Sequence, residues 1–180
     1  MANDAKALEL EIKQTLGKPS RPEDESDDEI RLIALAGLMR SDPGRAFPII
    51  EKLLKSAQSP RIQERTLFLL AETNFPQAQA LLEQTARGRN SDLQILAIKY
   101  LGSVKTGSPN RLFSEVYAST NDANVKNAVL DSLYSNGNAK ELVDLARSER
   151  DPKLQWEIVN RLSHMTAKEA IDYMVEILKK

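Results

Sequence analysis

The residue types that most often carry out chemistry are scarce in this chain, which has one histidine, His164, and no cysteine. Catalysis needs a positioned nucleophile, a base and usually a group that orients the base. Structural zinc sites are built mainly from cysteine and histidine side chains. His164 lies near the end of an apolar periodic segment, beside a turn, which is typical of a surface residue. We therefore predict no catalytic residue, no metal site and no cofactor, and we expect that the protein is not an enzyme.

Polar residues that recur about every 30 residues form the first candidate binding surface, each in a segment of helical periodicity. The row consists of Glu51, Glu83, Ser114 and Asp144, and Lys55 and Arg87 follow one helical turn after the two glutamates. One interpretation is a polar groove that binds a partner. The other is that Glu51–Lys55 and Glu83–Arg87 are i,i+4 pairs that only keep a helix soluble. The sequence leaves both interpretations open.

Trp156, the only tryptophan, is the second candidate. By helical geometry it lies roughly opposite the apolar stripe of its segment, as do Leu32 and Ile95 in earlier segments. Phe68 also lies off the stripe. An exposed tryptophan is a candidate interface anchor, because tryptophan is enriched at binding hot spots. Packing between neighbouring helices would instead cover these side chains. Both interpretations stand for Trp156, whereas packing is favoured for the other three.

The elements that must position these residues form a repeat. An apolar residue opens each unit, further core positions follow four and five residues later, and a leucine follows after eight. The openings lie 32, 31, 32 and 29 residues apart. These offsets fall on one face of a helix, and repetition at this period is typical of a solenoid. The opening residues are Ile30, Ile62, Leu93, Val125 and Leu154, and the closing residues are Leu38, Leu70, Leu101, Leu133 and Leu162.

Each unit also contains a second apolar segment of helical periodicity, usually preceded by a proline. Ser, Asn or Asp stands before most of the first segments, where such side chains accept hydrogen bonds from the free N–H groups of a helix start. No segment alternates β-branched and polar residues with the period of a strand. We predict an all-α fold, namely a right-handed α-solenoid of about five two-helix repeats with a short N-terminal helix.

The fifth unit carries the clearest family resemblance. It reads Asp151-Pro152-Lys153-Leu154, Ile158-Val159 and Leu162, then Ala167-Lys168-Glu169-Ala170-Ile171, Val175 and Leu178. This pattern resembles the short HEAT-like repeats of many bacterial proteins, and a weaker form covers residues 28–180. The resemblance implies an α-solenoid whose second helices line a concave face and whose usual work is to bind protein. The Asp and Arg ladder of many HEAT repeats is not regular here, because only Asp42 and Arg45 match it.

The amino-terminal part departs from the repeat. We expect a helix or cap over residues 1–17, where Ala5, Leu8, Ile12 and Leu16 have helical spacing. An acidic linker follows over residues 18–27, and the solenoid domain covers residues 28–180. Six of the seven residues from 23 to 29 are acidic. Such a block repels itself and prefers solvent, so a linker is favoured over an acidic tail that docks on a basic partner.

Overall charge and hydropathy limit the classes of partner that we expect for this chain. The formal net charge of -1 provides no basic field to attract nucleic acid. No apolar run approaches the roughly 20 residues that span a bilayer, and no signal peptide is recognised at the N-terminus. We expect no nucleic-acid partner and no membrane insertion. A cytoplasmic location is favoured, unless the chain is an excerpt of a longer protein.

These observations predict a non-enzymatic scaffold module that presents a curved helical-repeat surface to a protein or peptide. The alternative is a structural or oligomerisation domain of a larger protein. In that case the chain would self-associate through its C-terminal end, where Ile171, Met174, Val175 and Ile177 are unusually apolar. Since phycobilin lyases use related repeats, an enzyme or a lyase-like chaperone of a small molecule stays as a third class.

Overall fold

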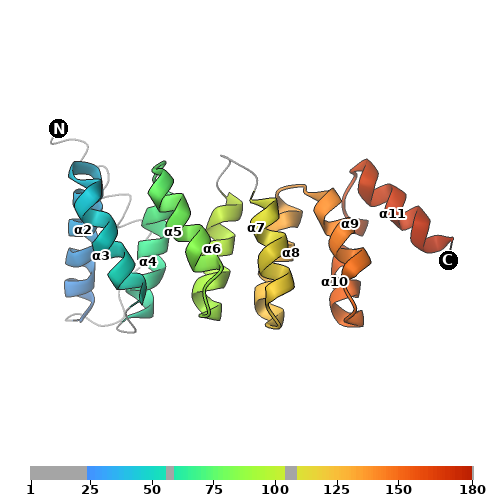
Figure 1. Ribbon diagram of the computed structural model, residues 1–180, viewed down its shortest axis with the longest axis horizontal. Helices are drawn as coiled ribbons and strands as arrows, with labels where there is room; N and C mark the ends of the chain where they lie inside the picture. The colour runs from blue at the N-terminus through green and yellow to red at the C-terminus, as the bar shows by residue number, and fades with distance from the viewer. Residues whose placement is uncertain (1–23, 56–58, 104–108, 180) are drawn as a thin grey trace. The chain divides into compact units, whose positions relative to one another are not determined.

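The computed structural model of the chain describes residues 24–55, 59–103 and 109–179, and within them it is all-α, with no strand (Figure 1). The helices are α2 (Asp24–Ser41), α3 (Pro43–Lys55), α4 (Pro60–Ala71), α5 (Pro76–Ala86), α6 (Ser91–Ser103), α7 (Asn110–Ser119), α8 (Ala123–Ser135), α9 (Ala139–Ser148), α10 (Pro152–Ser163) and α11 (Lys168–Leu178). None of these described helices is both long and apolar enough to cross a membrane.

The predicted helix or cap over residues 1–17 and the first part of the predicted acidic linker lie outside the described residues. The last part of that linker is helical, because α2 already begins at Asp24. Acidic residues at the start of a helix are favoured, since their charge interacts well with the positive end of the helix dipole. The acidic block therefore supplies the first turn of α2 as well as part of the connection before it.

The chain divides into two compact units, which separate between Thr66 and Leu67 inside α4. In the first unit α2 packs against α3. Two contacts join α2 to the start of α4. The Ser59 hydroxyl donates to the Asp28 carboxylate at 3.2 Å, and the Arg61 guanidinium lies 3.7 Å from the Glu29 carboxylate. These contacts hold the start of the next helix pair on the first.

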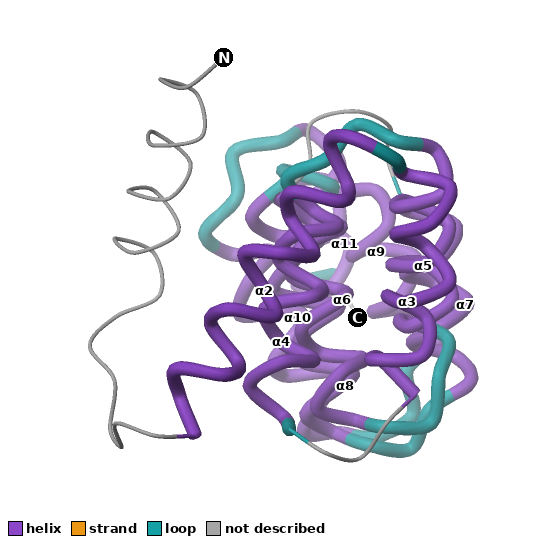
Figure 2. Tube along the Cα trace, turned by 90° about the vertical axis from the view of Figure 1, so that its left-hand side faces the viewer, coloured by secondary structure: helices purple, strands orange, loops and turns teal. Residues whose placement is uncertain are grey.

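In the second unit the helices pack on neighbours in sequence and, from α6 onward, also on helices two places along. Helix α6 contacts α5 and α8, α8 contacts α7, α9 and α10, and α11 contacts α9 and α10. Figure 2 shows α6, α8 and α10 on one side of this unit and α5, α7 and α9 on the other. The core lies between these two layers.

The repeated apolar positions are buried in four of the five predicted repeats. The positions that open and close the pattern are buried from Ile62 to Leu162. Phe113 and Tyr117 of α7 complete the core from the other layer. Burial of apolar side chains stabilises the fold by roughly 25 cal/mol per Å² removed from water. The helical spacing therefore predicted the buried face correctly wherever the helix is apolar on one side only.

In the first predicted repeat, which opens at Ile30, the predicted positions of the core-facing residues were wrong by one residue. Ile30 was predicted to open the core stripe, but its side chain is 60% exposed, and Leu38 is only half-buried. The buried residues of α2 are instead Leu32, Leu35, Ala36 and Met39. Helix α2 is apolar almost all round after its acidic first turns, so its sequence offers more than one stripe. Packing against α3 selects the stripe that contains Leu32, which was predicted to lie off the core arc.

Local signals set the ends of the helices that carry the site. The Asp151 carboxylate accepts from the backbone N–H groups of Lys153 and Leu154 at 2.8 and 3.2 Å, and Pro152 takes the first position of α10. After α8, Gly137 adopts a φ of 70°, which a residue without Cβ reaches at little cost. The next residue then donates its N–H to the Leu133 carbonyl at 2.9 Å. This is the Schellman arrangement that ends many helices.

Candidate functional site

The predicted polar row is only partly brought together. Glu51 and Lys55 pair at 3.5 Å along α3, and Glu83 and Arg87 pair at 3.6 Å along α5. Both are contacts within one helix, as the solubilising interpretation predicts. Ser114 is half-buried on α7, whereas the Asp144 side chain is exposed on α9. Among the described residues, no hydrogen bond or ion pair joins Ser114 or Asp144 to the charged pair of α5.

Arg87 does more than pair with its own helix, because it also reaches the neighbouring second helix. Its guanidinium donates to the Glu115 carboxylate of α7 at 3.1 Å, and Arg111 donates to the other oxygen of Glu115 at 3.0 Å. These hydrogen bonds, that from Arg87 first, hold the pKa of Glu115 below its usual range. Glu115 was missed, although its spacing from Arg111 is the i,i+4 spacing of a helix pair. The second helices α5 and α7 are therefore bridged by charge.

A matching bridge joins the last two second helices. Arg147 of α9 donates to the Glu176 carboxylate of α11 at 2.8 Å, and its guanidinium carbon lies 5.6 Å from the centre of the Tyr173 ring. An arginine over a tyrosine face gains cation–π attraction in addition to the ion pair. The polar face of α9 and α11 thus acts as a contact between helices. Arg147 and Glu176 are already engaged with each other before any partner arrives.

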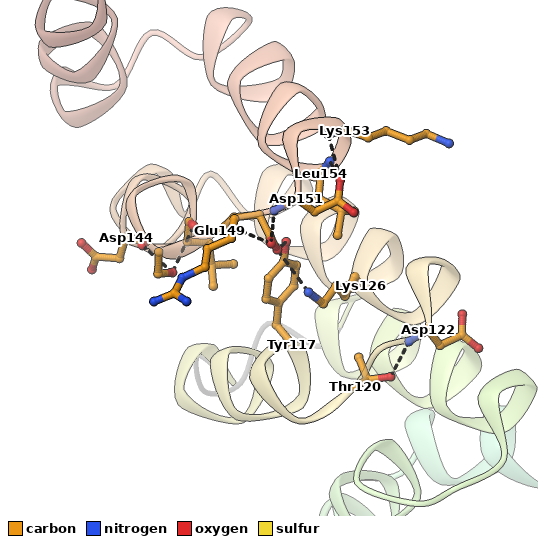
Figure 3. Close-up of polar contacts among 12 residues, drawn as sticks. Tyr117, Thr120, Asp122, Lys126, Asp144, Glu149, Asp151, Lys153 and Leu154 are labelled. Atoms are coloured by element: carbon orange, nitrogen blue, oxygen red, sulfur yellow. Dashed lines mark hydrogen bonds and ion pairs between the residues drawn. The ribbon is translucent and has the colours of Figure 1, made fainter. Parts of the chain in front are cut away.

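A largely buried polar cluster lies where α7, α8 and the turn between α9 and α10 meet (Figure 3). Glu149 stands at its centre with a side chain only 8% exposed. One carboxylate oxygen accepts from the Tyr117 hydroxyl at 2.6 Å and from the Lys126 ammonium at 3.1 Å. The other accepts from the backbone N–H groups of Arg150 and Asp151 at 2.8 and 2.9 Å. All four groups donate to one carboxylate.

The electrostatics of this cluster favour an ionised Glu149. Burial alone would raise its pKa, but the hydrogen bonds from Tyr117, Asp151, Lys126 and Arg150 outweigh burial and lower the pKa to about 2. Burial and the same carboxylate raise the pKa of the Tyr117 hydroxyl, so that it stays protonated and donates. Lys126 also lies 4.6 Å from the centre of the Tyr117 ring. A strongly ionised, fully bonded carboxylate is suited to holding helices together.

A recurring glutamine joins successive helices in three of the five predicted repeats. It stands directly after the opening apolar residue, and its side-chain amide donates to a carbonyl near the end of the preceding helix. The three bonds are Gln63 to Leu54 at 3.0 Å, Gln94 to Ala86 at 3.0 Å and Gln155 to Ala146 at 3.4 Å. Lys126 occupies the same position in the fourth unit. There the Lys126 ammonium donates to the Glu149 carboxylate in place of a helix-end carbonyl.

Trp156 lies on the outer face of α10, with its side chain 62% exposed. Its predicted position off the core arc is therefore confirmed. Ile95 and Phe68, at comparable positions, are half-buried, and Phe68 packs edge-on against Tyr100 with ring centres 6.0 Å apart. Packing was favoured for both. Trp156 is therefore the off-stripe side chain that offers a large open apolar face.

His164 caps α10 and shows no arrangement for proton transfer from a hydroxyl. Its Nδ1 lies 2.7 Å from the Asn160 carbonyl, which can only accept, so this nitrogen carries the proton. The Ser163 hydroxyl, 3.3 Å away, donates to the same carbonyl at 2.7 Å. Both side chains therefore donate their hydrogen bonds to the same backbone carbonyl in the last turn of α10. In the described part of the chain, no three His, Asp or Glu residues cluster so as to hold a metal ion.

A half-open cavity of about 300 Å³ lies in the second unit, beside the turn between α4 and α5. Its apolar walls come from Leu70, Ala71, Phe75, Pro76, Leu82, Leu101 and Pro109. Two of the three polar side chains that line it are engaged, since Thr73 donates to the Leu70 carbonyl at 2.9 Å and Gln79 to Glu83 at 3.1 Å. Ligand pockets usually span about 300–1,000 Å³. This hollow suits one apolar side chain more than a polar substrate.

No family model, curated protein or solved structure matches this chain.

Proposed function

We propose that this chain is a non-enzymatic module that binds a protein or peptide partner. In this proposal it is a right-handed α-solenoid of about five two-helix HEAT-like repeats. The packing of α6 on α8, α7 on α9, α8 on α10 and α9 on α11 supports such stacking. Polar contacts between predicted repeats within the second unit support it as well. Tyr117–Glu149, Asn110–Glu141 and Arg161–Asp131 each join residues about one repeat apart. Repeat proteins of this kind commonly use their extended surfaces for binding.

The observation that carries the proposal is the exposure of Trp156. A side chain of this size left 62% open to solvent has little role in the stability of its own unit. Buried at an interface, the same ring would release a large apolar surface from water and provide one hydrogen-bond donor. Helix α10 holds it firmly, because Leu154, Ile158 and Leu162 anchor the opposite face in the core. A rigidly held, open tryptophan is suited to be the central contact of a partner surface.

A peptide-display selection on the full chain tests this proposal. Peptides selected on the wild-type protein are measured for binding to Trp156→Ala and to Lys140→Ala, which removes an exposed side chain of α9 in the other helix layer. We expect Trp156→Ala to weaken binding at least tenfold, as hot-spot truncations do, and Lys140→Ala to change it less than twofold. Equal binding to Trp156→Ala and wild type would remove Trp156 from the binding surface.

The second candidate is an assembly domain, and the outer face of α11 favours it. Ile171, Val175 and Leu178 are spaced as one helical stripe and are all exposed, Leu178 to 86%. Contiguous exposed apolar side chains mark interaction surfaces more often than scattered ones do. In this alternative the chain associates with a second copy or with another part of a larger assembly through α11.

Light scattering over a tenfold concentration range separates the two candidates. A binding module stays at the monomer mass of 20.1 kDa throughout. An assembly domain gains mass with concentration, and Val175→Asp restores the monomer because it places a charge in the apolar stripe. Ala118→Asp is the matched control, since it adds the same single negative charge at an exposed position of α7, outside the stripe.

A further inference from the structure

The only Asn-Gly pair of the sequence, Asn136-Gly137, stands at the end of α8. In such a pair the backbone nitrogen of the glycine can attack the side-chain amide carbon of the asparagine, because no Cβ on the glycine hinders the approach. The new C–N bond closes a five-membered succinimide ring, and the side-chain nitrogen leaves as ammonia. Water then opens the ring at either carbonyl and leaves aspartate or isoaspartate. This deamidation consumes only water and changes no oxidation state.

The folded backbone holds the two reacting atoms apart. Asn136 follows the last turn of α8 with a φ of -90° and a ψ of 2°. At this ψ the Gly137 nitrogen eclipses the backbone nitrogen of Asn136, so it lies about 120° around the Cα–C bond from the Asn136 Cβ. Ring closure requires the Gly137 nitrogen to be nearly eclipsed with Cβ instead. The Gly137 N–H is also engaged, because it donates to the Tyr134 carbonyl at 3.0 Å.

The side-chain amide of Asn136 is engaged as well, and it links α8 to α6. Its Nδ2 donates to the Gly102 carbonyl of α6 at 2.8 Å and to the Ser132 carbonyl of α8 at 2.7 Å. An amide nitrogen has two N–H donors, so these two bonds use both of them. The approach is close because Gly102 has no side chain, and a Cβ there would lie 3.4 Å from the Asn136 Nδ2. The Asn136 amide therefore contributes to the packing of α8 on α6.

Neither product of the reaction can make this link. A carboxylate at neutral pH only accepts hydrogen bonds, so it would face the Gly102 and Ser132 carbonyl oxygens with no proton between them. Acceptors opposed in this way repel each other, and the two carbonyls lose their donor. Isoaspartate also lengthens the main chain by one carbon directly before Gly137, whose φ of 70° closes the helix end. Deamidation therefore removes the contact between Asn136 and α6 in either case.

We propose that Asn136 is a deamidation site that the fold protects, and that its modification breaks the contact of α8 with α6. The reaction starts only when the turn between α8 and α9 opens, because only then can the backbone of Asn136 rotate and its amide leave the Gly102 carbonyl. Local openings of this kind occur in folded proteins without global unfolding. Since the products cannot restore the link, each reaction makes a reversible opening permanent. This site is independent of the partner proposed for Trp156.

Peptide mapping of the full wild-type chain tests the protection. The protein is incubated at the same pH and temperature in native buffer and in guanidinium chloride, and mass spectrometry follows the conversion of Asn136. Asn124 is the internal control, because the branched side chain of Val125 after it hinders the attack. We expect Asn136 to convert at least ten times faster in guanidinium chloride than in native buffer, and faster there than Asn124. Equal rates for Asn136 in the two solutions, or a rate in guanidinium chloride no higher than that of Asn124, would overturn the proposal.

Thermal unfolding of a second variant tests the consequence of the modification. Asn136→Asp introduces the carboxylate directly. Asn160→Asp is the matched control, since it makes the same chemical change at an exposed position in the last turn of α10, where the helix dipole also disfavours a negative charge. We expect Asn136→Asp to lower the unfolding midpoint by several degrees more than Asn160→Asp does. Equal midpoints for the two variants would contradict a role of the Asn136 amide in holding α8 on α6.

Discussion

Replacement of Glu149 by glutamine tests whether the buried carboxylate holds the fourth and fifth units together. Glutamine has nearly the same shape but carries no charge, and it offers an NH₂ group where one carboxylate oxygen stood. Either the pair of donors Tyr117 and Lys126 or the pair of backbone N–H groups then loses its acceptor. The Lys126 ammonium, whose side chain is only 17% exposed, also loses its counter-ion.

The structure sets the magnitude. A pKa lowered from 4.5 to about 2 means that the folded state favours the ionised form of Glu149 by about 3 kcal/mol. Removal of one partner from a buried ion pair typically costs roughly 3–5 kcal/mol. We therefore expect Glu149→Gln to lower the free energy of unfolding by about 3 kcal/mol at neutral pH.

The pH dependence of this loss follows from the depressed pKa. The stabilisation is fully present above the unfolded pKa near 4.5 and is lost as the pH falls through the folded pKa of about 2. Since glutamine cannot titrate, the difference in stability between wild type and Glu149→Gln should shrink from about 3 kcal/mol at pH 7 to about 1.5 kcal/mol at pH 3. Wild-type stability therefore falls with acid more steeply than that of the variant.

Urea unfolding at pH 7, 5, 4 and 3 measures both quantities. Circular dichroism reports the helices, and fluorescence of the single tryptophan, Trp156, reports α10 next to the turn that carries Glu149. Glu169→Gln, at an exposed position of α11, is the matched control and should cost less than about 0.5 kcal/mol. A loss below about 1 kcal/mol for Glu149→Gln at pH 7, or a loss that does not change with pH, would refute the reasoning.

Three other substitutions test the packing, each by urea unfolding at neutral pH. Gly102→Ala should cost about 1–3 kcal/mol, because its Cβ would lie 3.0 Å from the Ser132 side chain, where α6 and α8 meet closely; an unchanged stability would mean that the two helices separate freely. Leu101→Ala should cost about 2–5 kcal/mol as a buried truncation, whereas Glu83→Ala should cost less than about 1 kcal/mol as a partly solvated helix charge; the reverse order would mean that core and surface are misassigned. Thr66→Val should raise stability by about 1 kcal/mol, because the buried Thr66 hydroxyl has no hydrogen-bond partner among the residues that the structure describes; a loss would indicate that the hydroxyl is satisfied.

At the candidate site, the sequence predicted the contacts within one helix but not the contacts between helices that are distant in the chain. The sequence predicted the i,i+4 pairs of Glu83 and Glu51, because both partners lie on one helix and helical geometry alone brings them together. It did not predict Tyr117–Glu149 or Arg147–Glu176, whose partners are 32 and 29 residues apart. Yet these separations are close to the repeat period. In a stack of similar units, residues one period apart are expected neighbours, so the period itself was the missed signal.

The sequence by itself determined the all-α class, the helix ends marked by residues such as Asp151 and Gly137, and the buried stripe of the later helices. These features depend on backbone geometry and on spacing within one helix, both of which are written locally in the chain. Only the tertiary structure decided which face of α2 is buried and that Trp156 stays exposed. Where a helix is apolar on both sides, or an apolar residue lies off the stripe, the sequence of that helix alone does not determine which side chains a neighbouring helix covers. The free energy of packing against another helix then makes the choice.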